Sequence, residues 1–223
     1  LQNEGVDDFI KNKLPSLKKM NVSLIVSIGG ETIDEYKILA DKLSNQRGIS
    51  AIELNVSCPN IEHASKGCGL FSQDGVAVNK IVKSVRKKTR IPIITKLSPN
   101  VTDIKPVAKH AEDAGSDAIA LINTFFGMSV DIKTRRSNLG NITGGLSGPC
   151  IRPIALFMVR EVFKAVKIPI IGMGGIMTAD DALEFIIAGA TAVSVGTANF
   201  VNPVSSIEII EGIKEYLTRN NIS

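Results

Sequence analysis

Short apolar runs alternate with longer amphipathic segments along the whole chain. The runs are rich in Ile and Val and lack in/out alternation, which predicts strands buried on both faces of a parallel sheet. We expect strands at residues 24–28, 51–56, 91–96, 118–122, 168–173 and 192–195. The longer segments repeat apolar residues at helical spacing, as at Val78, Ile81, Val82 and Val85. They predict helices at residues 6–17, 33–43, 75–88, 104–114, 151–166, 179–188 and 204–218.

This alternation predicts an α/β protein with about six β-α units. A closed (β/α)8 TIM barrel needs about eight units. Either the first two units lie upstream of Leu1, or the sheet is open and doubly wound. No linker or change of composition divides the chain, so we expect residues 1–223 to form a single domain. The chain starts without methionine and soon enters a predicted helix, which suggests the C-terminal three-quarters of a barrel.

Composition and charge narrow the function classes. The 223 residues are 44% hydrophobic and 22% charged, as in globular proteins. The net charge of +4 is scattered, and the basic cluster at residues 86–90 ends a predicted helix without an aromatic platform. We therefore expect no nucleic-acid partner. Gly189 and Gly196 interrupt the apolar stretch 185–201, which predicts a helix, a turn and a strand rather than a membrane span. Three cysteines offer no disulfide framework, so we expect a cytoplasmic protein.

Two connections are longer than the others. Residues 124–149 show no clear core helix, and we expect a functional loop there, because structureless loops of this length are uncommon in compact domains. This loop carries Lys133, Arg135 and Arg136. The second long loop, residues 61–74, directly follows the segment that contains Cys58.

Polar or glycine residues follow most of the predicted strands. In a parallel α/β barrel, the carboxyl ends of the strands carry the catalytic groups. The candidates of this kind are Asn55, Cys58, Lys96, Asn123, Thr124, Gly174, Gly175, Gly196 and Thr197.

The glycines after the last two strands indicate a phosphate-bearing ligand. Without a Cβ, the backbone can approach a ligand closely, and barrels often bind phosphate there. Thr178 to Asp181 also fits a helix-capping pattern just after the first glycine pair. The alternative explanation is that Gly174-Gly175 and Gly196-Thr197 simply form tight turns between a strand and the next helix.

Lys96, Asn55 and Asn123 suit a planar ligand. A buried ammonium needs an anionic partner, so we expect one for Lys96, which could also stabilise negative charge on a cofactor ring. Alternatively, the Lys96 side chain reaches solvent from the end of the strand and needs no anionic partner. Each asparagine offers a donor and an acceptor for an amide or imide edge, or else caps a turn.

Cys58 could be a nucleophile, a base or a metal ligand. His63 and Cys68 lie nearby in sequence, but their spacing fits no common zinc pattern, so we expect no metal site. Cys68 and Cys150 are expected to be inert thiols.

Five motifs together resemble one known family. They are Glu53-Leu54-Asn55-Val56-Ser57-Cys58-Pro59-Asn60, Lys96-Leu97-Ser98-Pro99-Asn100, Asn123-Thr124, Thr143-Gly144-Gly145-Leu146-Ser147-Gly148-Pro149 and Ile171-Gly172-Met173-Gly174-Gly175-Ile176. This set, which runs over nearly the whole chain, resembles the dihydroorotate dehydrogenases. Gly127-Met128 with Asp131-Ile132-Lys133-Thr134-Arg135 resembles the class 1B, NAD-linked branch.

The resemblance implies a (β/α)8 barrel that binds FMN and oxidises dihydroorotate to orotate in pyrimidine (UMP) biosynthesis. It implies that Cys58 is the catalytic base for the C5 proton while hydride passes from C6 to flavin N5. The implied FMN contacts are Asn55, Lys96, Ile122, Gly148, Gly174, Gly175, Gly196 and Thr197, with Ser27 where the family usually has an asparagine near the flavin. The implied substrate contacts are Leu1, Asn55, Asn123 and Thr124.

The class 1B resemblance also implies partners. These are an electron-transfer subunit with FAD and a 2Fe-2S cluster, which passes electrons to NAD+, and a second copy of the chain within a heterotetramer. Residues 61–74 are a little longer than usual for the family. Two other functions stay open: an FMN barrel acting on another dihydropyrimidine, and an inactive barrel that binds a phosphate ligand.

Overall fold

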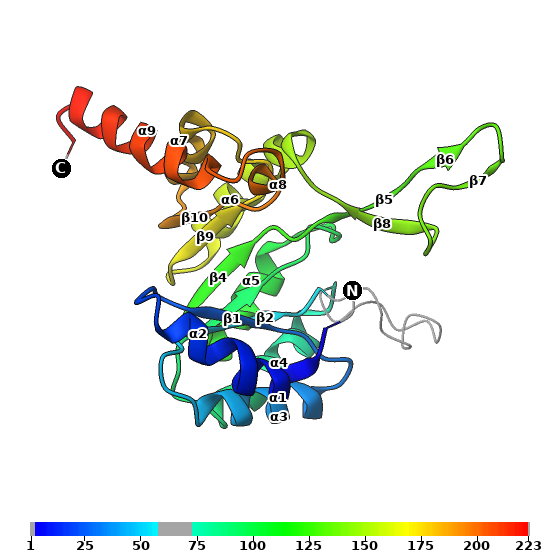
Figure 1. Cartoon of the computed structure of the whole chain (residues 1–223), viewed down its shortest axis with the longest axis vertical. Coiled ribbons are helices and arrows are strands. Elements are labelled where there is room, and N and C mark those ends of the chain that lie inside the picture. The colour runs from blue at the N-terminus through cyan, green and yellow to red at the C-terminus, as the bar shows by residue number, and fades with distance from the viewer. Residues whose placement is uncertain (1–2, 58–72, 223) are drawn as a thin grey trace. The chain divides into compact units, whose positions relative to one another are not determined.

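The computed structural model describes residues 3–57 and 73–222 (Figure 1). The chain divides into two compact units, and each is assembled from two stretches of sequence. Unit 1 comprises Leu1–Lys96 and Pro106–Ile119, and unit 2 comprises Leu97–Lys105 and Ala120–Ser223.

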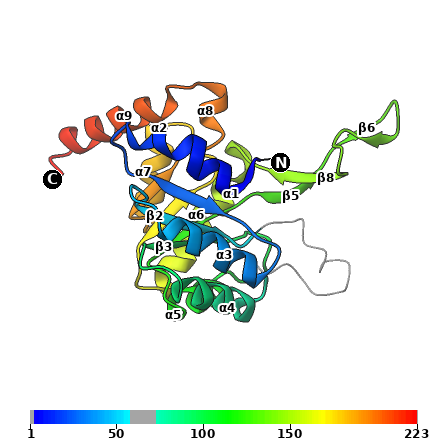
Figure 2. The same ribbon diagram turned by 60° about the horizontal axis from the view of Figure 1, so that its bottom comes forward.

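Unit 1 is built on three parallel strands. Strands β1 (Ile25–Ile28), β2 (Ala51–Asn55) and β3 (Ile93–Lys96) pair side by side in that order. Helices α3 (Ile33–Ser44) and α4 (Gly75–Arg86) connect them and pack on each other (Figure 2). The first helical segment consists of α1 (Gly5–Asp8), the π-helix η1 (Phe9–Lys13) and α2 (Leu14–Lys18), and α5 (Lys105–Asp113) lies mostly in this unit.

The core of unit 1 lies between the strands and these helices. The apolar faces that the sequence predicts for α3 and α4 are buried, and so are the central strand residues. Fully buried large side chains in this unit include Tyr36, Leu43, Ile52, Leu54, Ile81 and Ile93. Burial of such side chains is the main stabilising contribution to a fold of this kind.

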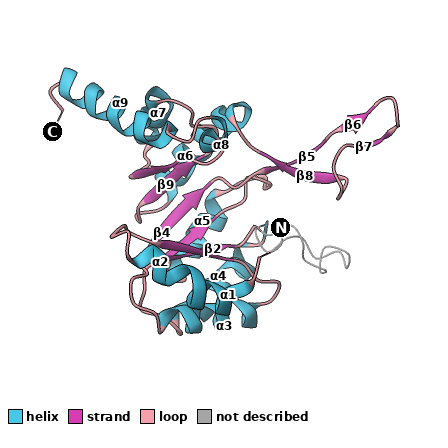
Figure 3. Cartoon of the chain, in the orientation of Figure 1, coloured by secondary structure: helices cyan, strands magenta, loops and turns pink. Residues whose placement is uncertain are grey.

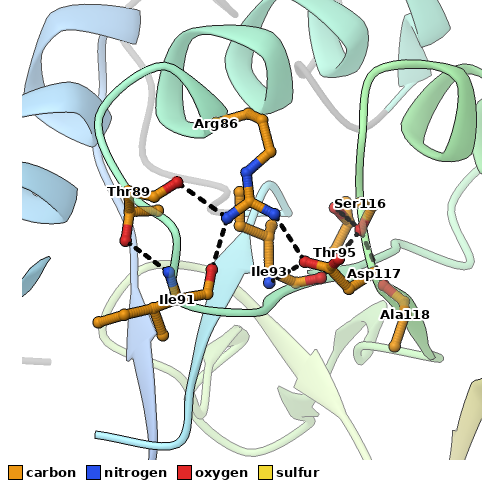
Figure 4. Close-up of polar contacts among 8 residues, drawn as sticks. All are labelled: Arg86, Thr89, Ile91, Ile93, Thr95, Ser116, Asp117 and Ala118. Atoms are coloured by element: carbon orange, nitrogen blue, oxygen red, sulfur yellow. Dashed lines mark hydrogen bonds and ion pairs between the residues drawn. The ribbon is translucent and has the colours of Figure 1, made fainter.

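A polar network closes the amino end of β3 (Figure 4). The Arg86 guanidinium donates to the carboxylate of Asp117 at 2.8 Å and to the backbone carbonyls of Thr89 and Ile91 at 3.0 and 2.6 Å. The same carboxylate accepts the backbone N–H of Ile93 at 2.7 Å. One side chain from α4 thus fixes the turn that leads into β3.

Unit 2 contains the second set of β-α elements. Strand β4 (Ala118–Leu121) gives its last two residues to this unit, and β9 (Ile170–Met173) pairs in parallel with β10 (Ala192–Ser194). Helix α7 (Ala179–Ala188) packs against both α6 (Arg152–Ala165) and α9 (Ser205–Arg219). Two shorter helices, η4 (Pro149–Ile151) and α8 (Ala198–Val201), complete the unit.

A two-stranded arm occupies the region for which the sequence predicts a loop. Strands β5 (Phe125–Met128) and β8 (Thr143–Leu146) pair antiparallel, and β6 (Val130–Asp131) and β7 (Arg136–Ser137) continue the ribbon, which extends away from the helices of unit 2 (Figure 1). The loop prediction was therefore wrong for the residues of these four strands, and the functional role expected for residues 124–149 stays a prediction. Strands of two to four residues, with glycines in β5 and β8, leave little periodic signal.

The alternation of strands and helices is confirmed (Figure 3). All six predicted parallel strands and the helices between them are present, with ends shifted by at most two residues except in the first helical segment, which divides into three. Helix α8 was not predicted from the sequence, because it is only four residues long. The protein has a parallel α/β fold, whereas the closed eight-unit barrel and the single domain stay predictions. Within residues 3–57 and 73–222, no helix is both long and apolar enough to cross a membrane.

Candidate active site

The carboxyl ends of β1, β2 and β3 bring four polar side chains to one face of unit 1. In the parallel register, Ser27 lies opposite Glu53, and Asn55 lies opposite Lys96. Side chains two residues apart on a strand point to the same face. Ser27, Glu53, Asn55 and Lys96 therefore share a face, and the last two end their strands.

Lys96 has the anionic partner that the sequence predicts. Its Nζ donates to Oε1 of Glu53 at 2.7 Å, and the two side chains are 17% and 14% exposed. The hydroxyl of Ser27 donates to the same carboxylate oxygen at 2.7 Å. Glu53 was absent from the predicted site residues, although its place within the apolar run 51–54 was a signal, because a buried carboxylate needs partners.

Asn55 is held at the carboxyl end of β2 by its backbone and its side chain. The hydroxyl of the fully buried Tyr36 donates to the Asn55 carbonyl at 2.7 Å. The Asn55 Oδ1 accepts the backbone N–H of Ser57 at 3.3 Å. The chain that leaves β2 toward position 58 therefore starts from a fixed point.

In unit 2, Ile122, Asn123 and Thr124 follow β4 directly. The Ile122 N–H donates to the Met173 carbonyl at 2.9 Å, and the Asn123 N–H donates to the Leu97 carbonyl at 2.9 Å. The Asn123 Oδ1 accepts the N–H of Thr124 at 2.9 Å. Backbone bonds on both sides thus fix the direction in which this strand end leaves the sheet.

Asn100 is a second polar residue absent from the predicted site. Its Nδ2 donates to the Ser98 hydroxyl at 2.9 Å and to the Thr124 carbonyl at 3.0 Å, and its Oδ1 accepts the N–H of Phe126 at 3.1 Å. Asn100 therefore ties the loop after Lys96 to the start of the arm. The sequence signal was its place in the Lys96-Leu97-Ser98-Pro99-Asn100 motif.

Three predicted glycines form a close backbone cluster in unit 2. Gly148, Gly174 and Gly175 have φ angles of 92°, 128° and 78°, which side-chain-bearing residues rarely adopt. A Cβ at Gly175 would lie 2.7 Å from the carbonyl oxygen of Gly148. A Cβ at Gly174 would lie 2.9 Å from the Cβ of Ala155. Glycine is required at both positions because of these φ angles and because a Cβ would clash with the Gly148 backbone at Gly175 and with the Ala155 side chain at Gly174.

Gly196 and Thr197 lie on the turn after β10. The Thr197 hydroxyl donates to the Ser147 hydroxyl at 2.9 Å, and a Cβ at Gly148 would lie 3.8 Å from the Thr197 methyl group. The structure therefore brings Thr197 next to Gly148. A Cβ at Gly196 would meet no protein atom within 4 Å, so its backbone borders open space.

The turn after Gly175 is fixed by the capping box that the sequence predicts for α7. The Thr178 hydroxyl accepts the N–H of Asp181, and Asp181 Oδ2 accepts the N–H groups of Met177 and Thr178 at 2.9 and 3.0 Å. Asp181 is also ion-paired with Arg152 at the start of α6. The glycine turn is therefore anchored to two helices of unit 2.

Two predicted site residues, Cys58 and Leu1, lie outside the described residues, and so do His63 and Cys68. Cys150 is exposed, with its thiol 3.7 Å from the Ser147 carbonyl. In the described part of the chain, no three His, Cys, Asp or Glu side chains cluster closely enough to hold a metal ion.

These features define a class: a parallel α/β protein with ion-paired and amide side chains at strand ends and glycine turns suited to a phosphate. The sequence profile of the dihydroorotate dehydrogenase family matches residues 1–217. The chain belongs to that family.

Its relatives include proteins named dihydroorotate dehydrogenase B (NAD(+)), catalytic subunit. The one from Desulforamulus reducens is 52% identical over 222 residues, and the one from Thermoanaerobacter sp. is 54% identical over 222 residues. The relative from Lachnoclostridium phytofermentans is 49% identical over 223 residues. Each alignment covers 100% of this chain and 72% or 73% of the relative.

Proposed function

We propose that this chain is the catalytic subunit of an NAD+-linked dihydroorotate dehydrogenase and oxidises dihydroorotate to orotate in pyrimidine biosynthesis. The observation that carries the proposal is the family match over residues 1–217. The names of the relatives, which specify the NAD(+)-linked B form, support the choice of branch.

The residues present fit FMN as the cofactor. The cluster of Gly148, Gly174 and Gly175, with the open backbone at Gly196, suits a phosphate, because main-chain N–H groups can approach it without a Cβ between them. Thr197 adds a hydroxyl there. Lys96 in unit 1 offers a cation for the flavin ring, and Ser27, Asn55 and Ile122 are proposed to complete the contacts. When bound, FMN supplies the hydride acceptor.

Cys58 is proposed to remove the C5 proton of the substrate. A proton next to a carbonyl needs a base within reach, and a thiolate is a competent base. Leu1, Asn55, Asn123 and Thr124 are proposed to bind and orient the substrate, because amide side chains match the donors and acceptors of a pyrimidine ring.

The assembly is proposed to be larger than one chain. "Catalytic subunit" in the names of the relatives supports a further subunit, and we propose that it carries FAD and a 2Fe-2S cluster and passes electrons to NAD+. We propose that two copies of the full-length protein form a homodimer within a heterotetramer in the cytoplasm. In each copy the first two β-α units, upstream of Leu1, would complete the (β/α)8 barrel.

An anaerobic titration of the full-length protein with dihydroorotate tests this function, with the visible flavin absorbance as the readout. We expect a yellow protein that is bleached by stoichiometric dihydroorotate. Bleaching by another dihydropyrimidine alone would assign a different substrate, and a yellow protein that no dihydropyrimidine bleaches would indicate an inactive barrel. A colourless protein that does not take up FMN would contradict the cofactor assignment.

Substitution of Cys58 by serine tests the base. Loss of a general base typically costs about 10²–10⁴-fold in rate, so we expect Cys58→Ser to slow flavin reduction by about that factor near neutral pH while FMN stays bound. Stopped-flow absorbance measures the rate. Cys150→Ser is the matched control, because it makes the same chemical change at an exposed thiol. Equal rates in the two variants would contradict the assignment.

A further inference from the structure

Glu53 is a largely buried carboxylate on the central strand of unit 1. Its side chain is 14% exposed and lies on the face that also carries Ser27 and Lys96, opposite to the fully buried Ile52 and Leu54. An ionised carboxylate in such surroundings persists only with hydrogen-bonding and charged partners.

Both partners of Glu53 reach the same oxygen atom. Oε1 accepts the Ser27 hydroxyl from β1 and the Lys96 ammonium from β3, each at 2.7 Å. The parallel register sets this arrangement, since Ser27 pairs with Glu53 and Glu53 pairs with Ile94, two residues before Lys96. The carboxylate of the central strand thus bridges the strands on either side.

The bridge fixes a side chain that would otherwise be mobile. A lysine ammonium sits on a flexible four-carbon stem. Here its position is set by a shorter side chain from a paired strand. The bridge also offsets the charge, so the face of unit 1 presents an ion pair at Lys96 in place of a full positive charge.

We propose that Glu53 is a positioning residue for Lys96 and sets the charge that Lys96 presents to the flavin. The Ser27 hydroxyl donates to the same carboxylate and so helps to hold Glu53 in place. This inference rests on the proposed function, in which Lys96 contacts FMN. Two-electron reduction adds negative charge to the flavin, so the balance between Lys96 and Glu53 regulates how readily FMN is reduced.

The test is the midpoint potential of FMN in the full-length protein, measured by spectroelectrochemistry. Glu53→Gln keeps an oxygen acceptor for Ser27 and Lys96 but removes the negative charge. We expect the reduction equilibrium constant to rise about tenfold, because an unscreened charge acts strongly in a partly buried site. A tenfold change corresponds to about 30 mV for a two-electron couple. An unchanged or lower potential would overturn the proposal.

Removal of Lys96 should have the opposite effect. Lys96→Met leaves Glu53 unpaired, and we expect the equilibrium constant to fall about tenfold. The double variant restores the net charge and replaces the pair with neutral groups, which proteins tolerate better than a single buried charge. We expect its potential to lie near that of the wild type. If Glu53→Gln alone does not fold, the effect of removing Glu53 is measured as the increase in FMN midpoint potential between Lys96→Met and the double variant.

Glu161→Gln is the matched control. Glu161 accepts from Lys105 at 3.0 Å and is 20% exposed, so this variant also removes the acid of a half-buried Lys–Glu pair, but on α6. We expect the wild-type potential in this variant, and an equal shift would overturn the proposal. Failure of the wild type to hold FMN would overturn the proposed function and this inference together. A wild type that holds FMN, with a potential insensitive to Glu53, would overturn this inference alone.

Discussion

At the scale of single residues, the electrostatics of a buried group can be predicted from sequence, but its partner cannot. The position of Lys96 at the end of an apolar strand predicts an anionic partner, and the structure identifies it as Glu53. The two residues are 43 positions apart in sequence, and only the register of β2 and β3 brings them together. The role proposed for Cys58 has a different basis: it comes from the family motif around this residue and not from burial or charge.

A second polar residue makes a prediction for stability. Arg86 makes hydrogen bonds to Asp117, Thr89 and Ile91 at the amino end of β3 (Figure 4). We expect Arg86→Ala to reduce the free energy of unfolding by about 1–3 kcal/mol, because it leaves partly buried acceptors without their donor. Urea denaturation followed by circular dichroism measures the loss.

The control for Arg86 is Arg90, which is exposed in the same basic cluster. Arg90→Ala should change the free energy of unfolding by less than about 0.5 kcal/mol, as is usual for exposed positions. Similar losses in the two variants would mean that the Arg86 contacts do not stabilise the unit.

At the scale of elements, periodicity and capping residues predicted most of the fold. Helix α7 begins and ends where the sequence predicts, because Thr178 and Asp181 form its capping box and Gly189, with φ of 120°, ends it. The arm escaped prediction because β6 and β7 are two residues long and β8 contains two adjacent glycines. Such ribbons are stabilised by pairing across the arm, which a single stretch of sequence does not reveal.

Helix α6 makes a prediction about pH. Hydrogen bonds from Lys164 and Lys105 lower the pKa of Glu161 to about 2. Because this pKa is lower in the folded chain than in the unfolded chain, where it is about 4.3, ionised Glu161 stabilises the fold fully above about pH 4.3. That stabilisation is lost as the pH falls toward 2. We expect Glu161→Gln to lower the urea midpoint at pH 7 and to have progressively less effect below about pH 4.3.

The matched control is Glu211→Gln on α9. Its carboxylate lies 3.8 Å from Lys214, and both side chains are well exposed. Exposed pairs of this kind contribute little to stability, so we expect the wild-type urea midpoint at every pH. A deficit of Glu161→Gln that did not vary with pH would contradict an electrostatic origin.

At the scale of the whole molecule, the sequence predicted the α/β class and the family. Alternating strands and helices fix the class because each buried strand needs helices to cover it. The family depended on five motifs spread over the chain, and the match over residues 1–217 bears it out. A barrel closes only when all of its strands pair in a ring. Neither the periodicity of the sequence nor the strand pairing within each unit tests that closure.

FMN should stabilise the whole protein. A ligand that binds only the folded state adds about 2.7 kcal/mol when its concentration is about 100 times its dissociation constant. We expect the melting temperature of flavin-depleted, full-length protein to rise on addition of FMN, as measured by differential scanning calorimetry. Riboflavin should give a smaller rise, because it lacks the phosphate assigned to the glycine turns.

Two glycines provide the matched pair for this experiment. A Cβ at Gly196 or at Gly140 would meet no protein atom within 4 Å, so both alanine variants should fold. We expect Gly196→Ala to reduce the FMN-dependent rise, because the new methyl group would occupy space assigned to the ligand. Gly140→Ala, on the arm, should retain the full rise. The same rise in both variants would contradict the placement of FMN next to Gly196.

The interleaving of the two units has a consequence for how this gene can change. Unit 1 takes residues from both sides of the stretch Leu97–Lys105, which belongs to unit 2. No single cut in the chain therefore separates the two units. A recombination event with one crossover point therefore cannot exchange one whole unit and leave the other whole.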